Sequence, residues 1–306
     1  MAAEIRVGTC SWADEMLSKL WYPRGVRGGE ERLRYYAEHF DVVEANSTYY
    51  RLPDAELVGK WAERTPDGFV MHVKAFGAMT RHPVKVDALP PDLRDVPQER
   101  GRVHRPPREW RAEVFRRFHE ALEPLRAAGK LGGILMQFPS YVVNKPQSLE
   151  YLEWAQEQLA GDEMMVEFRH ASWLAEDARA ETLRFLEERG MTYVVVDTPT
   201  LDSPTVAQTV VAATSPTAYV RFHGRNAATW NKRTGGPAER FDYLYSEEEL
   251  AAWVPQLREL AQAAEQAYAM FNNNGRSERP TGLGEATEPI AQAPENAAML
   301  KRLLAA

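Results

Sequence analysis

The chain alternates short apolar runs with amphipathic stretches along its whole length. Most of the apolar runs are continuous, which is typical of parallel strands that are covered on both faces. Together they predict strands over Ile5–Thr9, Val42–Asn46, Phe69–Lys74, Gly132–Gln137, Met164–Arg169, Tyr193–Asp197, Ala218–His223 and Ala267–Asn272.

Helix-start signals lie between these runs. Asp54 precedes AELVGKWAERT, Ser246 and Glu249 form a capping-box pattern, and Ser203-Pro204 fits an N-cap followed by proline. A last helix is predicted over Pro294–Leu304. Strand and helix signals in this alternation predict a (β/α)8 TIM barrel, formed as a single domain over residues 1–306.

A doubly wound sheet with an appended domain is the competing fold. Such a fold binds dinucleotides through a glycine-rich turn after a strand, and no turn of that kind is evident. Gly132-Gly133 stands at the start of a strand instead, so local packing is the favoured interpretation. We therefore expect no nicotinamide or flavin cofactor.

A long loop rich in proline and arginine follows the third predicted strand. Between Arg81 and Arg117 the chain holds ten Lys and Arg against six Asp and Glu, a net charge of +4 within a chain of net charge −7. In a barrel, a loop at this position lies on the face that carries active sites. A second irregular segment, 273–294, follows the last predicted strand.

Charged and amide side chains, several of them spaced two apart, stand at the ends of these strands. A spacing of two puts both members of a pair on one face of a strand. In a barrel such residues line the mouth, where the loops form the pocket. The candidate set is Glu44, Asn46, Lys74, Gln137, Glu167, Arg169, Asp197, Arg221, His223 and Asn272.

Composition narrows the class of protein. Hydrophobic content of 44% and charged content of 26% are ordinary for a globular domain, and the acidic balance argues against broad nucleic-acid binding. The single cysteine, Cys10, excludes an internal disulfide. No apolar run approaches the roughly 20 residues of a membrane span, and no signal peptide is evident. We therefore expect a cytoplasmic protein without a membrane partner.

The chain resembles the domain-of-unknown-function 72 family of YecE-like proteins. The matching segments include GTCSW, LWYPRG, VVEANSTYYRLP, LGGILMQFP, EFRHASW, YVRFHGRN, FDYLYSEEEL, FNNN and APENAAML, in order and nearly end to end. The resemblance implies a TIM barrel and no settled activity. The family usually carries a histidine where Asn274 and Gly275 stand here, which leaves open whether Asn274 takes its place.

The strand-end residues suggest roles in an enzyme. Glu44 and Glu167 are candidates for moving protons, and His223 with Asn272 for orienting the reacting group. Lys74, Arg169 and Arg221 would bind an anion, with Asn46, Gln137 and Asp197 as further binding groups. The alternative is a purely structural network of ion pairs and hydrogen bonds, in which each charged group is the partner of another.

The favoured function is therefore hydrolysis or isomerisation of a small anionic substrate, phosphorylated or sugar-like. A divalent metal is less favoured, because the ligand types are common and three cations lie in the same set. The alternative function is a nucleic-acid-binding or DNA-processing barrel that uses the Arg-rich loop 81–117. The sequence gives no oligomeric state.

Overall fold

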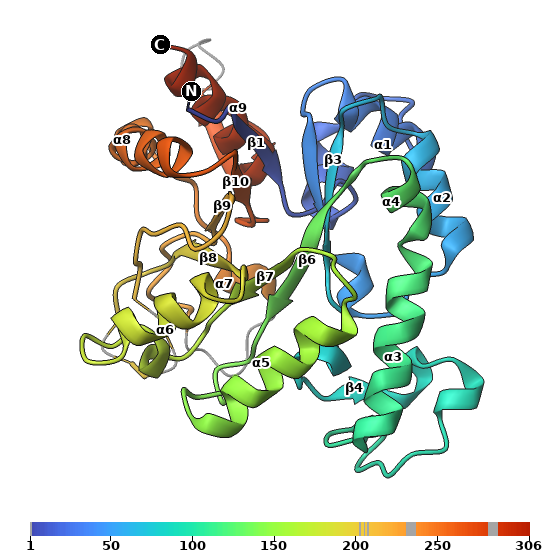
Figure 1. Cartoon of the computed structure of the whole chain (residues 1–306). Helices are drawn as coiled ribbons and strands as arrows, with labels where there is room; N and C mark the ends of the chain where they lie inside the picture. The colour runs from blue at the N-terminus through green and yellow to red at the C-terminus, as the bar shows by residue number, and fades with distance from the viewer. Residues whose placement is uncertain (1, 202, 205, 207, 231–236, 281–286) are drawn as a thin grey trace. The chain divides into compact units, whose positions relative to one another are not determined.

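The computed structural model shows a closed barrel of eight strands within the part of the chain that it describes (Figure 1). It describes residues 2–201, 203–204, 206, 208–230, 237–280 and 287–306. Around the barrel the strand order is β1-β10-β9-β8-β7-β6-β3-β2, with parallel pairing. The strands are β1 (Ile5–Thr9), β2 (Val42–Ala45), β3 (Val70–Lys74), β6 (Leu131–Gln137), β7 (Met164–Glu167), β8 (Thr192–Asp197), β9 (Thr217–Phe222) and β10 (Gln266–Phe271). The predicted (β/α)8 fold is confirmed.

Each predicted strand is found, with bounds that differ by at most two residues. The strands coincide with apolar runs because both faces of each strand are covered. Most strand positions are therefore buried. All residues of β7, β8 and β9 are buried, including Glu167, Asp197 and Arg221. Charged groups at strand ends are therefore held inside the protein, where polar groups need partners.

Two helices, α2 (Ala55–Glu63) and α8 (Glu247–Ala263), begin where their capping signals predict. The Asp54 side chain accepts a hydrogen bond from Leu57 N at 2.8 Å, and Ser246 with Glu249 forms the full capping box. No helix among the described residues is long and apolar enough to cross a bilayer. The helices are α1 (Gly29–Ala37), α2 (Ala55–Glu63), α3 (Arg108–Ala121), α4 (Glu123–Ala127), α5 (Pro146–Gln158), α6 (Arg179–Glu187), α7 (Pro237–Arg240), α8 (Glu247–Ala263) and α9 (Gln292–Ala305).

The helix predicted from Ser203-Pro204 is wrong for the described residues of that segment. Between β8 and β9 the described positions lie in turns, bends or irregular structure. Pro204 O accepts a hydrogen bond from Ala171 N at 2.8 Å, so the proline joins a turn contact instead of starting a helix. The segment is rich in threonine, valine and proline, which have weak helix propensity, and this composition outweighs the capping signal.

The two irregular segments contain small antiparallel sheets. After β3, the loop forms β4 (Val84–Lys85) and β5 (Arg102–Val103), with short helical turns over Gly77–Thr80, Val86–Ala88 and Pro91–Leu93. After β10, β11 (Arg276–Pro280) pairs with β12 (Thr287–Ala291). Further helical turns lie at Leu17–Trp21, Ser47–Tyr49 and Ala171–Trp173.

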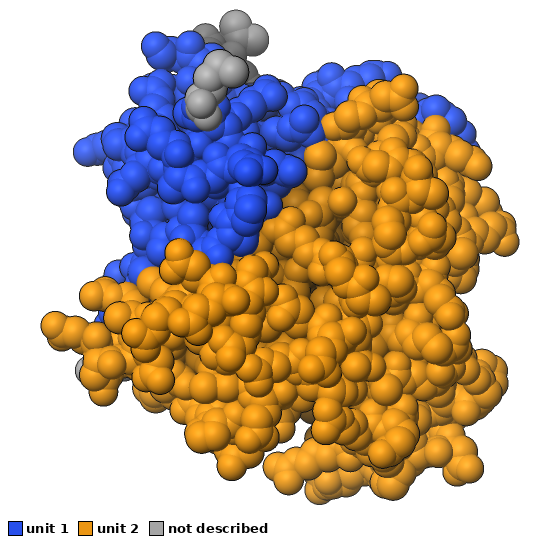
Figure 2. Space-filling model, viewed as in Figure 1, with its two compact units in different colours: residues 1–43, 193–202, 208–306 blue, residues 44–192, 203–207 orange. Residues whose placement is uncertain are grey.

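The chain divides into two compact units (Figure 2). Unit 1 consists of residues 1–43, 193–202 and 208–306, and unit 2 of residues 44–192 and 203–207. The single domain expected from the sequence stays a prediction.

Glycine at position 132, in unit 2, is required by packing. A Cβ there would lie 2.5 Å from Val70 Cγ1 and 2.6 Å from His72 Cε1, beside the bulge between β3 and β6. His72 is fully buried. These contacts support the packing interpretation of Gly132-Gly133 over a phosphate loop.

Candidate functional site

Four side chains form a hydrogen-bonded row at the strand ends of unit 2. Lys74 Nζ donates to Gln137 Oε1 at 2.8 Å, and Gln137 Nε2 donates to Glu167 Oε1 at 2.7 Å. Arg169 Nη1 donates to the same oxygen at 3.0 Å. Because β3, β6 and β7 are parallel neighbours, their carboxyl ends bring these residues together. We call Lys74, Gln137, Glu167 and Arg169 the polar row.

The chemistry of the polar row fixes the direction of its hydrogen bonds. An ammonium group only donates and an ionised carboxylate only accepts, so Gln137 must turn its oxygen to Lys74 and its nitrogen to Glu167. Glu167 is fully buried, whereas the Arg169 side chain is 15% exposed. A buried carboxylate is thus held between an amide and a partly open guanidinium.

Two rings lie next to Lys74. The Lys74 ammonium is 4.8 Å from the centroid of the Tyr49 ring, and the His82 ring packs edge-on against the same tyrosine at 5.2 Å. Burial and the positive charges of Lys74 and Arg169 lower the pKa of His82 to about 3. This imidazole is therefore neutral at physiological pH, and one of its nitrogens can accept a hydrogen bond.

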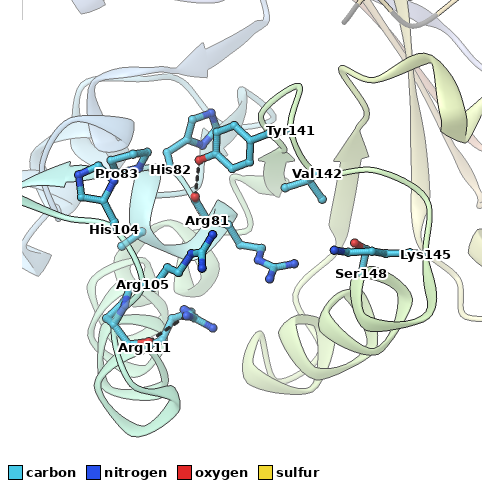
Figure 3. A pocket seen from close by; sticks show the side chains of 12 residues that line it. Arg81, His82, Pro83, His104, Arg105, Arg111, Tyr141, Val142, Lys145 and Ser148 are labelled. Carbon is cyan, nitrogen blue, oxygen red and sulfur yellow. Dashed lines mark hydrogen bonds between the residues drawn. The ribbon is translucent and has the colours of Figure 1, made fainter. Parts of the chain in front are cut away.

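His82 also lines a pocket of about 610 Å³ in unit 2 (Figure 3). Four of the lining side chains are Lys or Arg, and no Asp or Glu is found among the described residues that line it. The lining residues are Ala78, Arg81, His82, Pro83, His104, Arg105, Pro106, Arg111, Tyr141, Val142, Lys145 and Ser148. We call this the cationic pocket.

Three different parts of the chain supply the cations of the pocket. Arg81 follows the turn Gly77–Thr80, Arg111 lies in the first turn of α3, and Lys145 is the residue before α5. Arg81 has a positive φ of 67°, which is uncommon for a residue other than glycine. The Tyr141 hydroxyl donates to Arg81 O at 2.6 Å and fixes this backbone, so the turn places the arginine at the pocket.

The acidic residues of the Arg-rich loop neutralise other arginines. Glu113 accepts hydrogen bonds at 2.7 Å from both Arg116 and Arg117, and Asp92 pairs with Arg117. The arginines near Glu113 lower its pKa to about 2. Three of the remaining arginines of 81–117, Arg81, Arg105 and Arg111, line the cationic pocket, and Lys85, Arg94, Arg100 and Arg102 line a second cavity with Asp87.

In unit 1, Asp197 is the centre of a saturated network. Its carboxylate is 3% exposed and accepts from Arg225 Nε at 3.0 Å, Arg225 Nη2 at 2.9 Å and the Tyr245 hydroxyl at 2.6 Å. Burial and the Asp197 charge raise the pKa of Tyr245. Arg225 also reaches Glu249 at 3.3 Å. For Asp197, this geometry fits the structural alternative better than substrate binding.

His223 lies between two of the other predicted residues of unit 1. The imidazole is fully buried, with Nε2 3.3 Å from Arg221 Nη1 and Nδ1 3.0 Å from the Asn272 amide nitrogen. A neutral imidazole has one acceptor nitrogen, so His223 accepts either from Arg221 at Nε2 or from the Asn272 amide at Nδ1, but not from both. The structure thus places His223, Arg221 and Asn272 together, and their catalytic and binding roles stay predictions.

Two predicted residues lie at the end of β2. Glu44 is fully buried within the strand, and Asn46 follows it as the residue before the turn Ser47–Tyr49. Their roles in proton transfer and substrate binding stay predictions. Among the described residues, no group of three His, Cys, Asp or Glu comes together that could hold a metal ion.

Asn273, which the sequence reasoning missed, has a clear structural role. It is fully buried, and its amide nitrogen donates to Asn296 Oδ1 at 2.7 Å and to Tyr243 O at 2.9 Å. Asn296 in turn bonds the backbone of Tyr245. Three of the matching motifs, FDYLYSEEEL, FNNN and APENAAML, therefore join in one network. Asn274 lies beside it, with its amide nitrogen 3.5 Å from Asn272 Oδ1.

His82, Lys145 and Ser148 were also missed. The charge excess of the Arg-rich loop signals its arginines, but Lys145 and Ser148 lie more than 60 residues further on than Arg81, in an ordinary helix start. Only the folded chain brings the start of α5 to the loop that follows β3. Sequence spacing carries no signal for that contact.

Comparison with known proteins identifies the family. A model described as "Protein of unknown function DUF72" matches residues 6–306. UPF0759 protein YunF of Bacillus subtilis (strain 168) is 30% identical over 273 residues, which cover 88% of this chain and 89% of that protein. The solved structure of a DUF72 family protein (TM1631) from Thermotoga maritima MSB8 is 32% identical, with a TM-score of 0.74 and 99% of each chain covered.

A second solved structure supports the fold alone. The DUF72 family protein (EF0366) from Enterococcus faecalis V583 has a TM-score of 0.77 at 24% identity, covering 99% of this chain and 96% of that one. These structural matches over almost the whole chain agree with the barrel fold. The chain belongs to the DUF72 family of proteins of unknown function.

Proposed function

We propose that the protein is an enzyme that moves a proton on a small anionic substrate bound at the polar row. The observation that carries the proposal is the buried Glu167 carboxylate, joined through Gln137 to Lys74 and directly to Arg169. Polar residues at the carboxyl ends of barrel strands are where catalytic groups of this fold stand. A carboxylate so placed is rare without a purpose.

The roles follow from the chemistry of each group. Glu167 is the proton donor or acceptor, because it is the titratable acid in the row. Arg169 offers a forked donor for a carboxylate or phosphate, and Lys74 adds a point charge. Gln137 positions Glu167 and is not itself a proton carrier. An anionic substrate is favoured because Lys74 and Arg169 outnumber Glu167 in the row, and because the described residues that line the adjoining cationic pocket include four cations and no carboxylate.

Hydrolysis and isomerisation both fit this arrangement. Each needs a group that takes or gives a proton while fixed donors hold the charge that develops on the substrate. The polar row supplies one carboxylate for the first task and two cations for the second. The reaction class is therefore proton transfer to or from a bound anion.

Nucleic-acid binding is the alternative function, and the ion pairs of α3 weaken its support. Arg116 and Arg117 are bound to Glu113, Glu120 and Asp92, so they do not form an open basic track. Binding of a nucleic-acid backbone would require cations spread along a groove. The affinity of such binding falls steeply as the salt concentration rises. Four cations of unit 2 that pair with no described acid, Arg81, Arg105, Arg111 and Lys145, instead line one pocket.

Turnover of a panel of sugar phosphates, sugar acids and neutral sugars in deuterated water tests the proposal. Proton NMR detects both isomerisation, as deuterium incorporation, and hydrolysis, as new products. We expect the wild-type protein to convert at least one anionic member and Glu167→Gln to be slower by roughly 10²–10⁴-fold. Equal rates for the two proteins, or no conversion and no binding of any anionic member, would contradict it.

A further inference from the structure

We propose that the cationic pocket binds the phosphate group of the substrate, so that the substrate is a small phosphorylated molecule. The inference rests on the proposed function, because it assigns the substrate class of the same site. It extends that proposal to residues outside the polar row. Arg81, Arg105, Arg111, Lys145 and Ser148 are the groups that would hold the phosphate.

The cations of the pocket have no acidic partner within the described part of the chain. None of the carboxylates in the described ranges pairs with Arg81, Arg105, Arg111 or Lys145, whereas Arg116, on the same helix as Arg111, has both Glu113 and Glu120. Figure 3 shows Arg81, Arg105 and Arg111 on one side of the pocket, and Lys145 with Ser148 on the other. Like charges held this close repel one another, and a bound anion removes the repulsion.

Two arginines share one aromatic ring. The guanidinium carbons of Arg81 and Arg111 lie 5.1 and 5.3 Å from the centroid of the Tyr151 ring. The Tyr151 hydroxyl donates to Met79 O at 2.6 Å and is buried, so the ring is fixed. Stacking on a fixed ring holds both side chains in place before a ligand arrives. This preorganisation suits the forked recognition of a phosphate.

Two buried polar atoms of the pocket lining have no hydrogen-bond partner among the described residues. Ser148 is 2% exposed, and its hydroxyl finds no partner in the part of the chain that the structure describes; the same holds for Arg111 Nε. A buried polar group left unpaired is costly and is uncommon in native proteins. An anion oxygen in the pocket would give the hydroxyl and the guanidinium an acceptor.

Ser148 lies in the first turn of α5, a helix of 13 residues. This helix has no side-chain cap and no acidic residue in its first turn, so its positive end is not neutralised. Phosphate groups bind such helix ends through backbone N–H groups and the helix dipole. The positive end of α5, the cations of the pocket and the Ser148 hydroxyl therefore all favour a phosphate group as the ligand.

The pocket adjoins the polar row through His82. His82 lines the pocket, and its ring packs at 5.2 Å against the Tyr49 ring, whose centroid lies 4.8 Å from Lys74 Nζ of the row. A molecule with its phosphate in the pocket can therefore extend past His82 toward the row. A small phosphorylated substrate fits this geometry, because the volume of about 610 Å³ is that of a small-molecule site.

Binding of inorganic phosphate to the whole chain, measured by isothermal titration calorimetry at fixed ionic strength, tests the subsite. The variants are Lys145→Gln and Ser148→Ala, with Arg116→Gln as the matched loss of a cation outside the pocket. We expect Lys145→Gln to weaken binding roughly tenfold, equivalent to about 1.4 kcal/mol. Arg116→Gln should bind like the wild-type protein.

Ser148→Ala separates ligand binding from a structural role. We expect its thermal midpoint without phosphate to equal or exceed that of the wild-type protein, because an unpaired buried hydroxyl is removed. Its phosphate affinity should fall. A lower midpoint with unchanged affinity would assign the hydroxyl to the fold and overturn its part in the subsite. Equal affinity in all four proteins would overturn the whole inference.

The outcome also distinguishes this inference from the proposed function. If Glu167→Gln stops turnover while Lys145→Gln binds phosphate like the wild-type protein, the subsite fails and the enzyme proposal stands. If phosphate binding depends on Lys145 while Glu167→Gln turns over substrate normally, the subsite stands and the enzyme proposal fails. A single-stranded oligonucleotide that binds more tightly than phosphorylated sugars, with a steep salt dependence lost in Lys145→Gln, would replace the small substrate by nucleic acid.

Discussion

Replacing Asp197 by asparagine should destabilise the protein strongly while preserving the shape of the side chain. The carboxylate accepts from two nitrogens of Arg225 and from the Tyr245 hydroxyl. Asparagine keeps one oxygen and replaces the other by a donor. Either Arg225 or Tyr245 then faces an amide nitrogen, so at least one buried donor loses its acceptor.

The expected loss follows from burial. The Asp197 side chain is 4% exposed and that of Arg225 is 34% exposed, so water replaces only part of the missing interaction. A hydrogen bond to a charged group contributes about 1.5–3 kcal/mol, and breaking a buried pair costs about 3–5 kcal/mol. Because Arg225 is partly solvated, we expect the free energy of unfolding to fall by about 2–4 kcal/mol.

Urea unfolding followed by circular dichroism measures this change. Asp92→Asn is the matched control, because Asp92 also pairs with an arginine but has a side chain that is 61% exposed. An exposed pair contributes little, so the control should leave the unfolding midpoint nearly unchanged. An Asp197→Asn variant as stable as the wild-type protein would refute the saturated network as a source of stability.

Three further predictions concern stability. Burial raises the pKa of Asp14 from 3.8 to about 6, so the folded chain binds more protons than the unfolded chain between these values. The contribution of Asp14 to the free energy of unfolding should therefore fall as pH rises from 4 to 6, opposite to the rise that the lowered pKa of His82 contributes. Asp14→Asn should make the free energy of unfolding rise more steeply with pH over this range than in the wild-type protein; the same dependence in both proteins would contradict it. Gly132→Ala should cost about 1–3 kcal/mol in urea unfolding, because its Cβ would overlap Val70 and His72. Asn273→Leu should lower the thermal midpoint, because Tyr243 O loses the Asn273 donor and the buried Asn296 Oδ1 loses one of its two donors; an unaltered midpoint would exclude that role.

The fold could be predicted because the barrel strands carry their own signal. Continuous apolar runs such as those of β7 and β8 mark strands with two covered faces, and the capping residues Asp54 and Ser246 mark helix starts. The prediction failed at Ser203-Pro204. A capping pattern is present there, but the residues that follow it have weak helix propensity. A capping pattern nucleates a helix only where the later residues favour one.

The candidate site could be predicted in part. Spacing and strand ends found Lys74, Gln137, Glu167 and Arg169, because parallel neighbours bring their carboxyl ends together. The same rule could not show that Asp197 is saturated, because its partners come from later loops and helices.

The cationic pocket could not be predicted from the sequence either, because its residues come from segments that lie far apart in the chain. Its two walls come from the loop after β3 and from the start of α5, and no short motif links them. The excess of arginine over 81–117 predicted a charged region. It did not predict which arginines lack acidic partners, because that depends on the ion pairs of Glu113 and Asp92 in the folded chain.

The rate of Glu167→Gln on the best anionic substrate of the wild-type protein tests the central claim most directly. The substitution keeps the size of the side chain and an acceptor for Gln137 or Arg169, but removes the group that moves the proton. We predict that kcat falls by roughly 10²–10⁴-fold, while circular dichroism shows a folded protein and phosphate still binds. A folded Glu167→Gln variant with the wild-type kcat would contradict the claim.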